Sequence, residues 1–250
     1  MSTKIKLLGK NLTEVSGLLS HFDMVECLDG ETPELIITYG GDGALLGAER
    51  EYPAIPKLPI RDALTAPTCP EHTAEKVLTA YCENRLKLSR LPKLKAEMDK
   101  GDLFGINDLV VNTAEPTSAL RYRVFIDGEL HAPEVVGDGV CFSSIHGSTA
   151  YYRSITRGIF RVGVGLAFSN STEVVDHLVL PENSVVSLEI LRGEALVMAD
   201  NDPVKLHLNV GETISLRQTD ECAEILGLTG FMCPECRYLR HHLLSLNEKR

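Results

Sequence analysis

The sequence lacks any long apolar run. No stretch approaches the roughly 20 apolar residues that a membrane-spanning helix requires, and the first residues, Met1 to Lys6, contain no apolar segment typical of a secretory signal. We therefore expect a cytoplasmic protein that has no membrane partner.

The sequence also lacks an excess of positive charge. Its 25 lysines and arginines face 35 aspartates and glutamates, which gives a formal net charge of -10. Broad nucleic-acid binding needs a basic face that replaces the counterions of phosphate, so this class of function is excluded. Phosphate can still be bound locally by glycine-rich loops, helix N-termini and divalent cations.

A disulfide framework is missing as well. The seven cysteines are odd in number and scattered along the chain, which indicates reduced thiols. The pair Cys233 and Cys236, with His241 and His242 nearby, forms only half of a structural zinc site. Because no second compact pair is evident, helix capping and core packing explain the segment more simply, and no protein-held metal site is predicted.

The first hundred of the 250 residues have the pattern of an α/β domain. Strands are predicted at 5–8 and 34–38, and helices at 12–20 and 73–88. Prolines recur between Tyr52 and Pro70, and this pattern predicts an extended connection over the surface. A charged stretch follows at 87–102, and we place the domain boundary near Gly101.

From Ile106 the pattern becomes β-rich. Short β-branched or alternating runs are separated by turn residues, with one helix from Ser148 toward Thr156 and a helical tail over 233–246. The predicted strands are 109–112, 120–126, 178–180, 185–191, 195–198, 204–208 and 213–216, and an apolar run before Ser143 adds another.

The first polar motif is Gly40-Gly41-Asp42-Gly43, which lies between a predicted strand and a helix-forming run. Open α/β sheets bind ligands at this place. The glycines let the backbone approach a phosphate, and Asp42 is able to bind Mg²⁺ or orient a hydroxyl. The alternative is a structural turn whose aspartate caps the helix.

The second motif, Asn107-Asp108, leads a strongly β-forming run. A carboxylate accepts from both hydroxyls of a ribose diol, and the amide of Asn107 donates and accepts around a sugar or base. The alternative is a turn that caps the strand.

The third motif spans 137–151, where an apolar strand runs into Gly147-Ser148-Thr149 at the start of a helix. Backbone N–H groups and hydroxyls converge at such a place, which therefore attracts phosphate or the polar edge of a base.

In order, spacing and context, these three segments resemble the NAD kinase family. The resemblance covers most of residues 34–246 and is strongest over 105–160. It implies an N-terminal α/β domain (1–100) and an all-β, sandwich-like NAD-binding domain (101–226). A C-terminal helical segment (227–250) would return to the first domain.

The resemblance also implies Mg²⁺-dependent phosphoryl transfer from ATP or polyphosphate to the 2′-hydroxyl of the adenosine ribose of NAD, giving NADP. Asp42 would be the catalytic aspartate, and Asp138 would meet the nicotinamide amide. The family suggests a homodimer or homotetramer. The expected NAD-binding residues are Gly41, Gly43, Asn107, Asp108, Asp138, His146, Thr149, Ala150, Tyr151 and Ser154.

The chain departs from the family pattern at several positions. Ala44 stands where the family has threonine, Asp108 replaces a glutamate, and Ile145-His146 replaces a Pro-Thr or Pro-Ser pair. The segment 57–65 lacks the family's glycine-containing run. Lys57 or Arg61 is a candidate for binding the donor phosphate there, unless the segment is a solvated surface loop.

Two other functions stay open at this level. A noncatalytic NAD or adenine-nucleotide sensor would keep the β-domain pocket without a donor site, which Ala44 and the altered 57–65 segment favour. A lipid-kinase-like phosphotransferase shares the Gly40–Gly43 turn. The Asn107-Asp108 pair and the 147–151 segment favour a dinucleotide acceptor over a lipid.

Overall fold

The computed structural model describes residues 2–28, 30–65, 67–172 and 176–239. The chain forms two compact units. Unit 1 consists of Met1–Arg90 with Ala223–Arg250, and unit 2 of Leu91–Cys222. Within the described ranges, no helix is long and apolar enough to cross a membrane.

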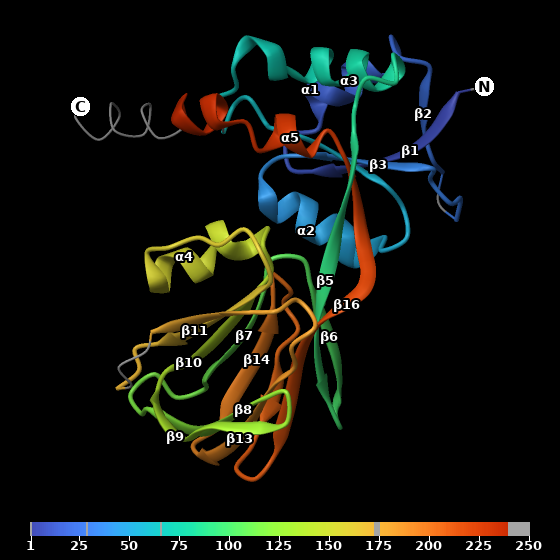
Figure 1. Cartoon of the computed structure of the whole chain (residues 1–250). Helices are drawn as coiled ribbons and strands as arrows, with labels where there is room; N and C mark the ends of the chain where they lie inside the picture. Colours follow the sequence, from blue (N-terminus) through green and yellow to red (C-terminus); the bar gives the residue numbers. More distant parts are fainter. Residues whose placement is uncertain (1, 29, 66, 173–175, 240–250) are drawn as a thin grey trace. The chain divides into compact units, whose positions relative to one another are not determined.

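Unit 1 is built on a parallel sheet (Figure 1). Its strand order is β2-β1-β3-β4, and the end of β16 pairs with β4 where Ile225 lies opposite Lys57. Every residue of β3 and β4 is buried, as expected for strands covered on both faces. The strands are β1 (Thr3–Gly9), β2 (Met24–Glu26), β3 (Leu35–Tyr39), β4 (Lys57–Ile60) and β16 (Thr213–Leu226).

Helices cover both faces of this sheet. Val15 of α1 and Leu78 of α3 share one core with Leu35 and Leu58 of the strands, whereas α2 lies on the other face (Figure 1). The short α5 contacts β4, so the C-terminal segment does return to the α/β domain. The elements are α1 (Thr13–Leu19), α2 (Asp42–Glu51), the 3-10 turn η1 (Pro70–His72), α3 (Ala74–Cys82) and α5 (Leu228–Phe231).

The prediction of a surface connection between Tyr52 and Pro70 was wrong, because β4 is a fully buried strand of the sheet. Gly40 N–H donates to the Ile60 carbonyl, and Ile36 N–H donates to the Pro56 carbonyl. The backbone groups that bond to β3 therefore belong to every second residue of this segment, Ile60 among them. The backbone nitrogen of Pro59 points to the other side, toward β16, which pairs with β4 at Lys57. The missing N–H of proline therefore removes no bond to β3.

Unit 2 consists of two antiparallel sheets that enclose one apolar core. One sheet has the order β16-β13-β8-β9, and the β5–β6 hairpin joins it through β16. The other has the order β12-β11-β10-β7-β14-β15. The fold class, an α/β domain with a β-sandwich-like domain, is thereby confirmed.

The elements of unit 2 include several strands that the sequence pattern missed, namely β5, β6, β9 and β11. The strands are β5 (Leu88–Met98), β6 (Gly101–Gly105), β7 (Asp108–Thr113), β8 (Leu120–Ile126), β9 (Glu129–Gly137), β10 (Gly139–Ser143), β11 (Val164–Ser169), β12 (His177–Leu180), β13 (Val186–Arg192), β14 (Ala195–Ala199) and β15 (Leu206–Leu208). The 3-10 turn η2 (Gly147–Thr149) leads into α4 (Tyr151–Thr156). The predicted C-terminal helix is present at 234–239, and its continuation to 246 lies outside the described residues.

Candidate functional site

In unit 1, the glycine-rich turn joins β3 to α2 as the sequence predicts. Gly40 has a φ of 151°, which favours glycine, and Gly41 is the N-cap of α2. The helix begins at Asp42, whose side chain is 56% exposed. The turn therefore places a half-exposed carboxylate at the N-terminus of a helix.

Arg61 follows β4 and holds this aspartate. Its Nη2 donates to Asp42 Oδ1 at 3.1 Å, and its Nε and Nη2 donate to the Phe231 carbonyl at 3.3 and 3.2 Å. The guanidinium also lies 3.6 Å from the centroid of the Phe231 ring, a cation–π arrangement. With a side chain only 7% exposed, Arg61 is a fixed positive charge beside Asp42.

Lys57, the other candidate for the donor phosphate, is not available to a ligand. It is fully buried, forms an ion pair with Glu49 and donates to the Tyr52 carbonyl at 2.6 Å. Its charge is neutralised inside unit 1. Of the two predicted residues, only Arg61 reaches the glycine-rich turn.

Arg61 also lines a cavity of about 500 Å³ in unit 1. Lys76, Arg85 and Lys87 line the same cavity, together with Glu71, which forms an ion pair with Lys76 at 3.1 Å. A cavity with several cationic side chains is suited to an anionic ligand.

Sequence reasoning missed further polar residues at this edge of the sheet. Asn11 Nδ2 donates to Asp62 Oδ2 at 2.6 Å, and the Tyr39 hydroxyl donates to Glu14 Oε2 at 2.5 Å. Burial raises the pKa of Asp62, but hydrogen bonds from Asn11 and Leu64 N–H outweigh it and hold the pKa below its usual value. The signal was present, since Asn11 and Asp62 closely follow the parallel strands β1 and β4.

In unit 2, Asp200 fixes the turn that carries the second motif. Its carboxylate accepts from the backbone N–H groups of Ile106, Asn107 and Asp108 at 2.7, 2.8 and 3.2 Å. The Asp200 N–H in turn donates to the Asp108 carbonyl at 3.0 Å. Asp200 was not among the predicted site residues; it lies directly after β14.

The third motif packs directly on the second. Ser144 Oγ donates to the Ile106 carbonyl at 2.6 Å and accepts from Gly147 N–H at 3.1 Å. A Cβ on Gly147 would lie 2.0 Å from the Asn107 carbonyl oxygen, so no other residue fits. The structure therefore brings these two motifs together through backbone contacts that require glycine.

Asp108 is the most strongly perturbed acid of this site. Burial, then the nearby Asp200 charge, raises its pKa to about 7, although a hydrogen bond from Tyr151 N–H opposes the shift. The buried Oδ1 of Asn107 has no hydrogen-bond partner among the described residues. Buried polar atoms are rarely left unpaired, so this oxygen is a ready acceptor for a hydroxyl or amine.

The other predicted residues of unit 2 fall into two groups. His146 and Thr149 are half-buried around η2, and Ala150, Tyr151 and Ser154 are exposed around α4. These five continue the chain directly from the packed motifs. The Ser154 hydroxyl already donates to the Tyr151 carbonyl at 2.7 Å.

Asp138 belongs to the other group. In the β7–β10 pairing, Ser143 lies opposite Asp108, whereas Gly139 lies opposite Asn112. Asp138 therefore lies at the far end of β10, and the structure does not bring it together with the Asn107-Asp108 pair. Its side chain accepts from Asn170.

The fold has close counterparts among solved structures. An NAD kinase from Archaeoglobus fulgidus in complex with ATP superposes with a TM-score of 0.74 over 96% of this chain and 99% of that one, at 16% identity. Yeast NADH kinase complexed with NADH gives a TM-score of 0.72 over 93% and 87%, at 17% identity. The class defined here is thus a two-domain protein with the NAD kinase fold.

Sequence comparison gives the same result, although no family model matches the chain. The NAD kinase of Thermomicrobium roseum is 27% identical over 82% of this chain and 75% of its own length. The bifunctional NADP phosphatase/NAD kinase of Methanococcus maripaludis is 25% identical over 89% of this chain, which spans 40% of that relative. The chain is therefore similar to NAD kinases in sequence over most of its length, and it shares their fold.

Proposed function

We propose that the protein is an NAD kinase, which transfers the terminal phosphoryl group of ATP, or of polyphosphate, to the adenosine 2′-hydroxyl of NAD and gives NADP. The observation that carries the proposal is the joined site of unit 2, where a buried carboxyl and an unpartnered amide oxygen adjoin a helix N-terminus. Curated relatives that bear this name support the reaction.

Unit 2 would bind the acceptor. The carboxylate of Asp108 accepts from both hydroxyls of a ribose diol, and Asn107 Oδ1 accepts from the sugar or base. Thr149, Ala150 and Tyr151 would line the adenine and ribose pocket, with His146 and Ser154 at its margin. Asp138 lies at the other end of β10 from the Asn107-Asp108 pair, so it would bind the nicotinamide amide apart from that pair.

Unit 1 would supply the chemistry. Asp42 would orient or deprotonate the reacting hydroxyl, and the glycines at 41 and 43 allow the ligand to approach the backbone. Arg61 fixes the Asp42 carboxylate through its 3.1 Å contact and adds a positive charge where phosphate charge develops. Phosphoryl transfer needs positioning and charge neutralisation above all, and these residues provide both.

A divalent cation, Mg²⁺ or another, would complete the charge neutralisation. Such ions bind carboxylate and phosphate oxygens, and the half-exposed Asp42 carboxylate fits this requirement. Asp42 would therefore hold the ion together with the donor's own oxygens.

The test is NADP formation by the purified protein with NAD, Mg²⁺ and either ATP or polyphosphate. The proposal expects turnover that depends on the cation and on one of the two donors. Binding of NAD without formation of NADP would instead support the noncatalytic sensor. Ala44 and the burial of Lys57 favour that alternative, because both remove groups that could bind the phosphate donor.

We further propose a cytoplasmic homodimer or homotetramer. Light scattering on the purified protein measures its oligomeric state, and a monomer at assay concentration would exclude this part of the proposal.

A further inference from the structure

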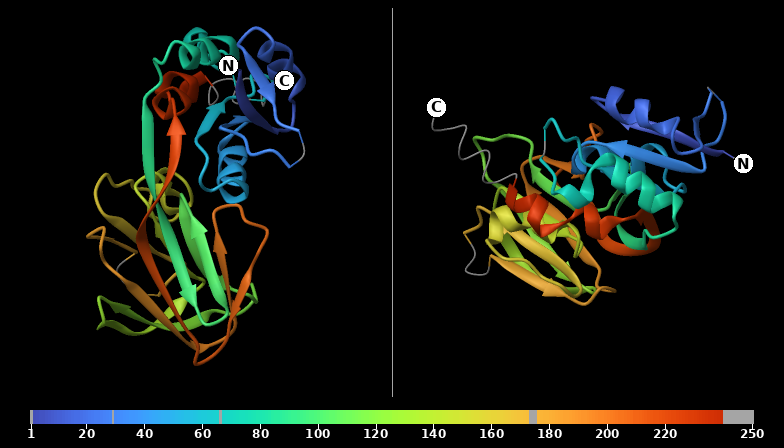
Figure 2. Two further views of the ribbon diagram at one scale, coloured as in Figure 1. Left: turned by 90° about the vertical axis from the view of Figure 1, so that its right-hand side faces the viewer. Right: turned by 90° about the horizontal axis from the view of Figure 1, so that it is seen from above.

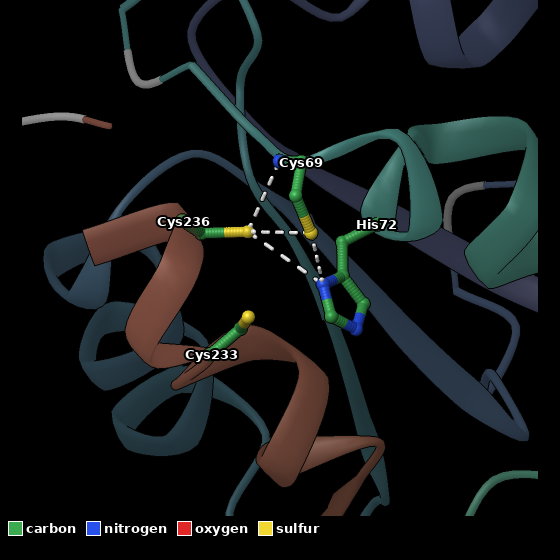
Figure 3. Close-up of side chains that lie close together, drawn as sticks. All are labelled: Cys69, His72, Cys233 and Cys236. Carbon is green, nitrogen blue, oxygen red and sulfur yellow. Dashed lines mark hydrogen bonds between the residues drawn. The ribbon is translucent and has the colours of Figure 1, made fainter. Parts of the chain in front are cut away.

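Four side chains that the proposed reaction does not use converge in unit 1. Cys69 and His72 lie at the start and end of the turn that contains η1, whereas Cys233 and Cys236 follow α5 near the end of the described chain. Both views of Figure 2 show the segment with α5 (red) beside the segment with α3 (teal). In Figure 3 the three sulfurs and the His72 ring face one small space.

The four ligand atoms lie close enough together to share one metal ion. His72 Nδ1 lies 3.0 Å from Cys69 Sγ and 3.6 Å from Cys236 Sγ, and the two sulfurs are 3.4 Å apart. All four ligand atoms lie within 4.8 Å of one another. Zinc bound to sulfur at about 2.3 Å and to nitrogen at about 2.0 Å would separate its ligands by about 3.5–3.8 Å.

Backbone N–H groups point at two of the three sulfurs. Cys69 N–H donates to Cys236 Sγ at 3.3 Å, and the backbone N–H groups of Glu235 and Cys236 donate to Cys233. Such bonds offset the negative charge of metal-bound sulfur. Cys69 and Cys236 are buried, and His72 and Cys233 are half-buried, so the four side chains form a largely enclosed set with four protein ligands, as in structural zinc sites.

We propose that Cys69, His72, Cys233 and Cys236 bind a structural zinc ion in a Cys₃His site. Each ligand pair has two intervening residues, which is a common spacing for zinc, and a soft thiolate set in tetrahedral array selects this metal. A disulfide between Cys69 and Cys236 would account for two of the four side chains and leave the convergence of His72 and Cys233 unexplained.

The ion would join two segments that are distant in sequence. Phe231, two residues before Cys233, accepts the hydrogen bonds of Arg61, which in turn contacts Asp42. Fastening the 233–236 segment to the η1 turn therefore stabilises the contact that positions the Asp42 carboxylate. Sequence reasoning missed the site because its halves are separated by more than 160 residues.

The test is the metal content of the full chain, purified under reducing conditions without added metal and measured by mass spectrometry. We expect one zinc ion per chain in the wild type, and loss of that zinc in Cys236→Ser and Cys233→Ser. Cys82→Ser, an exposed cysteine of the same unit, is the matched control and should retain the full zinc content. The conservative variant His72→Cys should also retain it.

A second measurement does not depend on the variants folding. Removal of the ion from the wild type by a chelator should lower its melting temperature, and added Zn²⁺ should restore it. Added Co²⁺ should give the absorption bands of a tetrahedral thiolate site. Wild-type protein that contains no zinc and gives no such spectrum would overturn the proposal, as would iron in place of zinc or a Cys69–Cys236 disulfide.

Discussion

The central carboxyl groups of the two units differ in exposure and in the charge of their neighbours. Asp42 of unit 1 is half exposed and held by a fixed arginine, whereas Asp108 of unit 2 is only 6% exposed and lies close to a second acid, Asp200. In the proposed reaction, the first arrangement would keep a charged carboxylate available to the metal ion and the reacting hydroxyl. The second tunes an acid to a pKa of about 7, suited to hydroxyl groups. We therefore expect variants of unit 1 to change turnover and those of unit 2 to change NAD affinity.

Asp42→Asn should have the largest effect. Removal of a residue that acts on the reacting proton should lower the rate of NADP formation by about 100-fold or more, while NAD affinity stays within about tenfold. Steady-state kinetics and calorimetric titration measure the two quantities. Glu51→Gln, at the exposed end of the same helix, is the control, and comparable turnover in both variants would remove Asp42 from the chemistry.

Gly147→Ala should disrupt the proposed acceptor site of unit 2. The new Cβ would lie 2.0 Å from the Asn107 carbonyl oxygen, and overpacking of this kind costs about 3 kcal/mol. Denaturant unfolding with NAD titration measures the loss. Gly17→Ala is the control, because a Cβ there meets nothing within 4 Å in helix α1. Equal stability of the two variants would show that the two motifs do not pack as described.

These two sites differ in how much of them the sequence could predict. The strand-turn-helix around Asp42 is a local pattern, and the structure confirms it. The Asn107-Asp108 pair was found, but Asp200, which holds its backbone, is more than 90 residues away and could not be placed without the β7–β14 pairing.

The buried strand β4 shows the same limit. Prolines normally interrupt sheets, so the local pattern predicted a surface connection, while the tertiary position of Pro59 on the β16 side removes the conflict. The charged residues of β5 likewise concealed a strand, because Lys93 is buried beside Leu94 and interrupts the alternation of apolar and polar positions. Patterns local to one segment were predictable, and those set by distant partners were not.

The pH dependence of NAD binding sharpens the contrast between the two acids. Burial raises the pKa of Asp108 to about 7, and the ionised form is the hydroxyl acceptor. NAD affinity should therefore rise about tenfold from about pH 6 to about pH 8. Asp108→Asn should remove this dependence and Asp99→Asn, an exposed acid of unit 2, should keep it. A flat profile in the wild type would contradict the role of Asp108.

The same raised pKa affects stability in the opposite direction. The folded state favours the neutral form of Asp108. The stabilisation of the folded state by this group is therefore fully present below the unfolded pKa of about 4, and it is lost as pH rises through about 7. Ligand-free protein should therefore unfold more easily at high pH because of this group, and Asp108→Asn should reduce that change in thermal denaturation.

Thr149→Val should have the smallest effect. Loss of one hydroxyl contact is expected to weaken NAD binding by about threefold to tenfold, without a change in the rate at saturating NAD. Thr117→Val, on an exposed turn of unit 2, is the matched control. Unchanged affinity in Thr149→Val would place the adenine and ribose pocket elsewhere.

The most direct test of the account follows the phosphoryl group itself. Wild-type protein is incubated with NAD, Mg²⁺ and ATP labelled in its terminal phosphate, and the label in the dinucleotide is measured. The account predicts labelled NADP, with the phosphate on the adenosine 2′-oxygen, in an amount equal to the ATP consumed. Protein that binds NAD but never transfers label to it, from ATP or from labelled polyphosphate, would contradict the account.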